Sequence, residues 1–242
     1  EMHELTDTQD EWIIGNGENS LAAFFLHEDF RDYYYRKGFG LHIAQEIGWN
    51  MRFKVKYLAD EYDSTVNQTD WALFGEKNFR DNFGFLPGGG NVFEGMMRSV
   101  IASGEYLLFN GDMELSASTE FSGDEIGGDF NFRRYIFETR GRFGVSGYES
   151  IVYRLKLGTS GGNGLPPQRL FTLGGLSTLR GFPHKEFVGD KMALLNLEYR
   201  LNYVGTLDWL FDIIRPVVFT DIGSVHPDLY DDFDVEYLKN DV

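Results

Sequence analysis

The stretch Leu173-Gly174-Gly175-Leu176-Ser177-Thr178-Leu179-Arg180-Gly181-Phe182 lies in a long connection between two strongly alternating segments. This connection runs from Gly158 to about Asp190 and is rich in glycine and proline. Glycine lets a backbone bend sharply and approach other groups closely. An arginine in such a loop carries five hydrogen-bond donors and a permanent charge. On its own the stretch is typical of a solvated surface loop, so the segments on either side decide the fold.

These flanking segments alternate between apolar and polar side chains, with the two-residue period of β-strands. Before the loop, residues 132–145 and 151–157 place aromatic and aliphatic side chains at odd positions and mostly charged ones at even positions. Residues 193–203 repeat the pattern after the loop. Residues 39–47 and 51–57 alternate as well, and the short turn between them predicts a β-hairpin.

The remaining segments also indicate strands joined by loops. We expect further strands at 21–26, 93–108, 112–121 and 216–223, and a long acidic loop over residues 60–92. Loops of that length are uncommon in compact domains and are usually functional. No stretch of useful length shows the 3.6-residue periodicity of a helix. The expected fold is therefore all-β and antiparallel.

Two architectures share this alternation. In a soluble sandwich the apolar face of each strand packs on a second sheet. In a membrane barrel that face meets lipid and the charged face lines the lumen. The long loops, strands of roughly 10 residues or more and an aromatic content of 16% favour an antiparallel transmembrane β-barrel. No run reaches the roughly 18 apolar residues of a membrane-spanning helix.

Composition excludes several classes of function. The chain has 38 acidic and 22 basic residues, a net charge of -16, which disfavours nucleic acid as a partner. Cysteine is absent, which removes disulfides, thiol nucleophiles and cysteine-ligated metals. The 5 histidines are scattered. We therefore expect no metal and no cofactor.

On the barrel interpretation, one group of basic side chains shares the face that lines the lumen. Inward acids such as Glu138 and Glu198 can pair with some of them. We hypothesise a cationic, hydrogen-bonded water channel inside an acidic shell, and single-channel currents with strong cation preference would contradict it. The basic group consists of Arg52, Lys54, Lys56, Arg134, Arg140, Arg142, Arg154, Lys156 and Arg200.

Three motifs follow one another along the second half of the chain. They are Gly174-Gly175-x-x-Thr178-x-Arg180-Gly181-Phe182, then Asn196-Leu197-Glu198-Tyr199-Arg200, then Phe219-Thr220-Asp221-Ile222-Gly223. The first resembles the signature loop of the BamA/TamA superfamily of bacterial outer-membrane barrels, also called the surface-antigen family. The second resembles the strand that follows this loop, and the third is similar to the family's Phe-x-Asp-x-Gly strand motif. The resemblance covers most of the chain.

The resemblance implies a sixteen-stranded barrel in the bacterial outer membrane, with the glycine-rich loop folded back into the lumen. There Arg180 would bond Asp221 and Glu198 on the inner wall, and a guanidinium fork suits such carboxylates. Parity alone already puts Glu198 on the lumen face, whereas Asp221 shares parity with Val217 and Phe219 and is not placed by periodicity. An internal brace and a functional switch remain equally open. The loop residues implied are Gly174, Gly175, Arg180, Gly181 and Phe182.

We interpret residues 1–242 as a single β-barrel domain, incomplete at both ends, with no POTRA domain in this chain. The candidate strands number about nine or ten, fewer than the sixteen that the resemblance implies. An open barrel edge in lipid would leave backbone groups unpaired at high cost.

The expected function is assembly or insertion of outer-membrane proteins, or translocation of a polypeptide or lipid. The expected partners are outer-membrane lipids, nascent outer-membrane proteins, and periplasmic or lipoprotein partners. The alternative is a structural or porin-like barrel, or a membrane anchor for a fused periplasmic or surface domain. We expect no Gly-x-Ser-x-Gly nucleophile elbow, no His-Glu-x-x-His site and no Walker loop, so no catalytic residue is assigned and the protein is not expected to be an enzyme.

Overall fold

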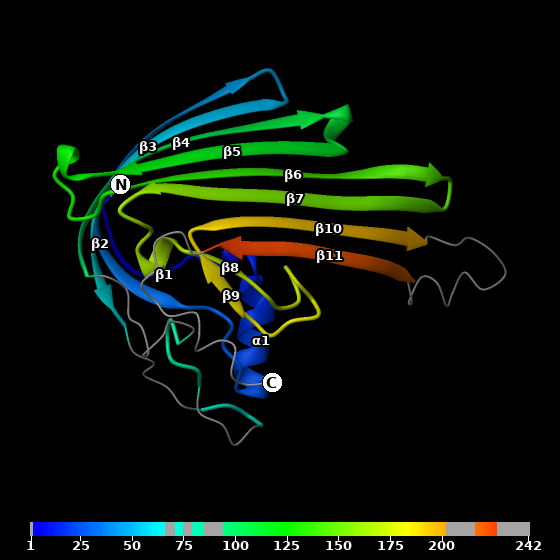
Figure 1. Ribbon diagram of the computed structural model, residues 1–242, viewed down its shortest axis with the longest axis horizontal. Coiled ribbons are helices and arrows are strands. Elements are labelled where there is room, and N and C mark those ends of the chain that lie inside the picture. Colours follow the sequence, from blue (N-terminus) through cyan, green and yellow to red (C-terminus); the bar gives the residue numbers. More distant parts are fainter. Residues whose placement is uncertain (1, 66–70, 75–78, 85–93, 202–215, 227–242) are drawn as a thin grey trace.

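The computed structural model describes residues 2–65, 71–74, 79–84, 94–201 and 216–226. Nine strands form one antiparallel sheet in the order β1-β2-β3-β4-β5-β6-β7-β10-β11, and the sheet curves around a concave face (Figure 1). A second sheet, β8 with β9, lies in that concavity. The strands are β1 (Met2–Thr8), β2 (Tyr33–Ile47), β3 (Met51–Ser64), β4 (Gly95–Leu108), β5 (Met113–Ser122), β6 (Phe132–Ser146), β7 (Glu149–Gly162), β8 (Phe171–Leu173), β9 (Phe187–Gly189), β10 (Lys191–Leu201) and β11 (Val217–His226).

Short and long connections alternate between the two ends of the sheet. Turns of a few residues join β2 to β3, β4 to β5 and β6 to β7. The connections at the other end span residues 9–32, 65–94, 123–131 and 163–190. Among the described residues they carry one α-helix, α1 (Asn16–Leu26), and the short 3-10 helices η1 (Asp10–Trp12), η3 (Asp124–Ile126) and η4 (Pro167–Arg169), while η2 (Phe109–Gly111) lies in the β4–β5 turn.

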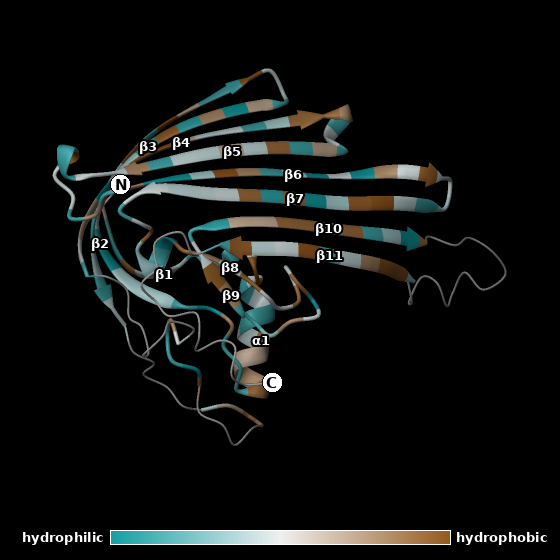
Figure 2. Ribbon diagram, in the orientation of Figure 1, coloured by the Kyte–Doolittle hydropathy of each residue, from teal (hydrophilic) through white to brown (hydrophobic). Residues whose placement is uncertain are grey.

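The predicted hairpin and the alternating strands are confirmed. Ile43 pairs with Val55 across β2 and β3, and both side chains point away from the concave face, 79% and 53% exposed. Hydrophobic and hydrophilic residues alternate along the strands (Figure 2). An apolar outer face without a second large sheet over it, among the described residues, is the wall of a barrel and not half of a sandwich.

The concave face is filled by side chains of the inward-folded 163–190 connection. Phe171 packs on Gly158 of β7, where a Cβ atom would lie 2.6 Å from the ring. Leu173 and Leu179 pack on Gly223 of β11, where a Cβ atom would lie 3.0 Å from each side chain. Glycine at these two wall positions therefore makes room for the connection. The buried cluster comprises Tyr34, Tyr62, Phe83, Met97, Phe132, Leu165, Leu170, Phe171, Leu173, Leu179, Met192 and Leu194.

The strand predicted at 21–26 is wrong, because this apolar run is the second half of α1. A short apolar run between polar segments does not distinguish a strand from a helix by periodicity. The buried side chain of Asn19 accepts a hydrogen bond from the backbone of Phe30 (2.9 Å) and donates one to Asp29 (2.9 Å). These bonds hold the chain after α1 against the helix. Within the described ranges, neither α1 nor any other helix has the length and apolarity needed to cross a membrane.

The start of the chain and the predicted long loop also differ from expectation. No strand is predicted before residue 21, but Met2–Thr8 forms β1, which pairs with β2 along its whole length. The predicted loop 60–92 begins too early, because β3 continues to Ser64. Asp60 is fully buried there and accepts hydrogen bonds from His3 (2.9 Å) and Arg36 (2.8 Å). Polar residues that pair across β2 and β3 extend the strand beyond the point where the hydrophobic alternation stops. Much of the remaining loop, and Phe93 at the start of the next predicted strand, lie outside the described residues.

Candidate functional site

The glycine-rich turn between β8 and β9 has a backbone that only glycine adopts easily. Gly174 and Gly175 have φ angles of 120° and 93°. A Cβ atom on Gly174 would lie 2.1 Å from the carbonyl oxygen of Pro183. The Thr178 hydroxyl accepts a hydrogen bond from the Gly174 nitrogen (2.8 Å) and donates one to the Gly174 oxygen (2.9 Å). The sequence thus closes a tight turn that presents Arg180 to the wall.

Arg180 binds Asp221 of β11 through both ends of the carboxylate. Its Nε donates to Oδ2 at 2.8 Å and its Nη2 donates to Oδ1 at 2.7 Å. The backbone nitrogen of Arg180 adds a third hydrogen bond to Oδ2 at 3.1 Å. Parallel guanidinium–carboxylate bonds fix direction as well as distance. They fasten the turn to one residue of one strand.

The remaining face and edge of the guanidinium are also occupied. Its Nη1 donates to Oε1 of Glu198 at 2.7 Å. Its Cζ atom lies 3.6 Å from the centroid of the Phe219 ring, a cation–π contact. Hydrogen bonds to Asp221 and Glu198 outweigh desolvation and raise the pKa of Arg180 above its ordinary value. Arg180 thus stays cationic, and its side chain is only 20% exposed.

Asn196 holds the acceptor in place, a role that the sequence did not reveal. Asn196 of β10 stands opposite Asp221 of β11 in the sheet register. Its Nδ2 donates to Asp221 Oδ1 at 2.8 Å and to the carbonyl oxygen of Thr178 at 2.7 Å. The only sequence signal was its place in the Asn196–Arg200 motif. We call Arg180, Asp221, Glu198 and Asn196 the arginine brace.

A scan against protein-family models matches the Omp85 superfamily domain to residues 20–234. The chain belongs to the Omp85 superfamily. This confirms the family expected from the three motifs. Together with the curved antiparallel sheet, Omp85 membership identifies an outer-membrane β-barrel. Bacterial barrels carry their long loops on the outer side, so the arginine brace holds a loop that enters from that end.

Comparison with solved structures finds the same fold in BamA. The crystal structure of BamA from Haemophilus ducreyi lacking POTRA domains 1-3 has a TM-score of 0.59 and 11% identity, and the match covers 87% of this chain and 45% of that one. CdiB from Acinetobacter baumannii has a TM-score of 0.48 and 15% identity, over 82% of this chain and 37% of that one. The chain thus spans less than half the length of either. Among curated protein sequences none matches.

The other predicted residues of the Omp85 loop differ in what they contact. Gly181 has no atom within 4 Å of a Cβ position, so its surroundings leave space for a side chain. Phe182 is 50% exposed, and its ring lies 5.0 Å from that of Phe187 in an edge-on arrangement. Gly174 and Arg180 are therefore the positions of the signature loop whose residue type the geometry requires most clearly.

Most of the predicted basic lining is paired with acids. Arg140 bonds Glu114 at 2.9 Å and Arg200 bonds Glu198 at 2.6 Å. Arg154 (2.9 Å) and Lys156 (3.2 Å) both reach Glu138. Both also lie over the Trp12 ring of η1, at 5.1 Å and 3.8 Å from its centroid. Arg142 shares this face and is exposed. The cationic water channel stays a prediction, and ion pairs describe the inner wall of this Omp85 sheet better than free cations.

A second charged cluster joins three of the long connections, and it was not predicted from the sequence. Lys185, after the Omp85 signature turn, donates to Asp10 at 2.7 Å and also to Asp32. Asp32 also forms an ion pair with Arg80 at 2.9 Å. Burial would raise the pKa of Asp32, but Lys185 and Arg80 beside it hold that pKa below its ordinary value. Residues from three separate loops carry no periodic signal, so only the fold brings this cluster together.

The expectation that the chain contains no Gly-x-Ser-x-Gly string is wrong. Gly158-Thr159-Ser160-Gly161-Gly162 has the Gly-x-Ser-x-Gly spacing of a hydrolase nucleophile elbow. It lies inside β7 and not at a strand-to-helix turn. The Ser160 hydroxyl donates to Asp190 at 3.1 Å. No group of three potential metal ligands occurs in the part of the chain that the structure describes.

Proposed function

We propose that this Omp85 barrel assists the insertion of outer-membrane proteins or the translocation of a polypeptide or lipid, without covalent chemistry. The observation that carries the proposal is the arginine brace, which fastens an inward-folded loop to two wall strands. Such a loop changes the lumen according to whether it is seated or released, and Arg180 is the side chain that joins its turn to β10 and β11. The partners proposed are outer-membrane lipids, nascent outer-membrane proteins, and periplasmic or lipoprotein partners.

The packed inner face argues against the porin-like alternative. Porins keep a polar, water-filled channel. Here Phe171 and Leu173 of the inward loop are 2% and 0% exposed and belong to the apolar cluster against the wall. A lumen lined in this way does not favour a permanent open pore. A barrel that only anchors a fused domain could use the same brace for stability, so the test must separate stability from activity.

Depletion of the protein tests the role in cells. We expect folded outer-membrane proteins, or the surface polypeptide or lipid that it exports, to fall as the protein is lost. Normal levels of all three after depletion would exclude the proposal. Quantitative immunoblotting of heat-modifiable outer-membrane proteins is the measurement.

Arg180→Ala tests the brace itself. We expect the variant to insert and remain heat-modifiable but to lose most activity in the depletion strain, because Asp221 and Glu198 no longer hold the turn. Arg200→Ala is the matched control, since it removes the other guanidinium from Glu198 on a side chain that is 46% exposed. If Arg180→Ala matched the wild type in activity and protease resistance, the brace would have no role in function.

A further inference from the structure

A cavity of about 470 Å³ lies between the concave wall and the inward-folded elements η1 and η4. Its size is within the range of small-molecule sites, about 300–1,000 Å³. Six basic and five acidic side chains line it, so the lining is net positive in a chain whose overall charge is -16. The basic side chains are Arg36, Lys56, Arg134, Lys156, Arg169 and Lys185, and the acidic ones are Asp7, Asp10, Glu11, Asp32 and Glu120.

The acids of this cavity are largely engaged by other bases. Both oxygens of Glu120 accept from Nε of Arg169 at 3.1 Å, and Arg169 Nη2 donates to the Tyr62 hydroxyl at 3.0 Å. Asp7 forms an ion pair with Arg36 at 2.7 Å. Asp10 and Asp32 belong to the Lys185 cluster already described, and the side chain of Glu11 is exposed.

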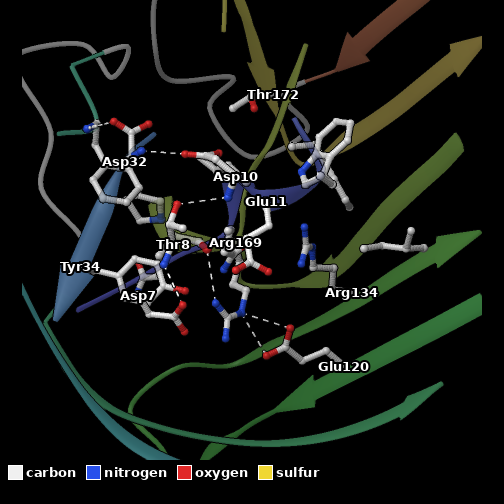
Figure 3. A pocket seen from close by; sticks show the side chains of 18 of the residues that line it. Asp7, Thr8, Asp10, Glu11, Asp32, Tyr34, Glu120, Arg134, Arg169 and Thr172 are labelled. Carbon is white, nitrogen blue, oxygen red and sulfur yellow. Dashed lines mark hydrogen bonds and ion pairs between the residues drawn. The ribbon is translucent and has the colours of Figure 1, made fainter. Parts of the chain in front are cut away.

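Arg134 differs from the other bases of the lining. It stands opposite Glu120 in the register of β5 and β6, but Arg169 already occupies that carboxylate. The Nε atom of Arg134 is buried and has no hydrogen-bond partner among the described residues. Its Cζ atom lies 4.6 Å from the centroid of the Phe171 ring, which contacts the face of the guanidinium and accepts no ordinary hydrogen bond. In Figure 3 its guanidinium group points into the cavity without a dashed contact.

A guanidinium cannot release its proton to escape burial. A buried cation is costly unless hydrogen-bond acceptors surround it. A planar oxyanion satisfies the guanidinium fork with two parallel bonds. Arg134 and Arg169 lie beside a single carboxylate, that of Glu120. One further negative group would therefore balance the second guanidinium charge.

We propose that this cavity is a binding site for a small oxyanion, a carboxylate or a phosphate, held by Arg134. The Phe171 ring fixes the guanidinium plane, and the Trp12 side chain forms part of the wall beside Lys156. The ligand would lie between the wall and the inward loop, in contact with both. This site does not depend on the proposed transport role.

The full-length protein in detergent or nanodiscs allows a direct titration. Inorganic phosphate and acetate are added separately at constant ionic strength, and Trp12 in the cavity reports binding by its fluorescence. We expect a saturable change that Trp12→Phe abolishes. Arg134→Gln should weaken the affinity at least about tenfold, the order expected from losing one charge-assisted bidentate pair. The phosphate and acetate arms show which oxyanion is preferred.

Arg142→Gln is the matched control, because Arg142 lies on the same face of β6, is exposed and does not line the cavity. It should bind like the wild type. No saturable change with either anion, or equal affinity in Arg134→Gln, would overturn the proposal. If Arg134→Gln does not fold, thermal unfolding of the wild type decides instead. Phosphate or acetate must then raise the midpoint, and an unchanged midpoint with both refutes the site.

Discussion

Arg180 illustrates what a single side chain contributes that composition does not. Lysine at this position would keep the charge but lose the fork that meets both oxygens of Asp221. Because the arginine brace joins a turn to two strands, its main contribution is to fix the orientation of that turn relative to the wall. Removing one partner of a fully buried pair costs about 3–5 kcal/mol. We expect less here, about 1–3 kcal/mol, because Arg180 retains 20% exposure.

The sequence placed Glu198 on the inner wall by parity and left Asp221 to the resemblance. The register explains why. Phe219, Asp221 and Gly223 face inward as a set, opposite Glu198, Asn196 and Leu194 of β10. An aromatic residue and a glycine beside the acid look like an outward, lipid-facing pattern. They face inward because Phe219 contacts Arg180 and Gly223 admits Leu173 and Leu179.

His184 predicts a pH dependence at the same scale. Burial, with Lys185 and Arg80 nearby, lowers the pKa of His184 to about 4 from an ordinary value of 6.5. Between these two pH values the unfolded chain binds a proton that the folded loop does not. Acidification through this window should therefore destabilise the folded state by up to about 1.4 kcal/mol per pH unit. Above about pH 6.5 the contribution of His184 to the free energy of unfolding no longer changes with pH.

Thermal unfolding of the wild type and His184→Phe from pH 8 to pH 4 measures the contribution of His184 to stability. The ring of Phe30 packs edge-on against His184, so phenylalanine suits the site. The midpoints of the two proteins should diverge only below about pH 6.5. Parallel pH profiles would show that His184 titrates normally in the folded protein.

At the scale of elements, glycine in a wall strand marks where an inward segment rests. Gly158→Ala should displace the Phe171 ring and destabilise the barrel by about 1–3 kcal/mol, the usual cost of overpacking. Gly161→Ala on the same strand has no atom within 4 Å of its Cβ position and is the control. Urea unfolding of both variants in micelles is the measurement, and equal midpoints would contradict the packing argument.

The Lys185 cluster makes a second prediction about elements. Lys185 is 3% exposed and bonds acids from the first long connection. Lys185→Met should leave Asp10 and Asp32 with too little positive charge and cost about 3–5 kcal/mol. Limited proteolysis should then cut the long connections faster. Lys37→Met is the control, since the Lys37–Glu4 pair is 61% and 58% exposed and contributes little. Unchanged cleavage of Lys185→Met would show that the loops are held by other contacts.

Element types were predictable where one face of a strand is apolar and long, as in β6, β7 and β10. Prediction failed where the chain leaves the wall. The run Leu21–Leu26 lies in a helix whose Phe24 is 45% exposed, so its composition says little about its conformation. β1 is short and polar and is specified by its partner: Met2 to Thr8 pair with Phe39 to Tyr33. Such pairing is not visible in either segment alone.

At the scale of the whole molecule, the outer face separates a membrane barrel from a soluble protein. Ile43 is 79% exposed in the middle of the apolar band of β2. In water Ile43→Arg would be nearly neutral, whereas at the bilayer midplane arginine costs about 2–4 kcal/mol. We expect Ile43→Arg to reduce the heat-modifiable, membrane-inserted fraction. His42→Arg, which points to the inner face, is the control, and equal assembly of the two variants would contradict a lipid-facing role for this band.

The pairing of Asn196 with Asp221 gives the brace a consequence for assembly. A slip of one residue between β10 and β11 would turn Asp221 to the outer face. A slip of two would move it by about 6.6–6.8 Å along the strand, beyond the reach of Arg180. The loop can therefore close only on the correct alignment of β10 and β11. The hydrogen bonds of Arg180 therefore form only in the correct register of β10 and β11. In a barrel with the wrong register the loop would not dock on the wall, and proteases would cleave it.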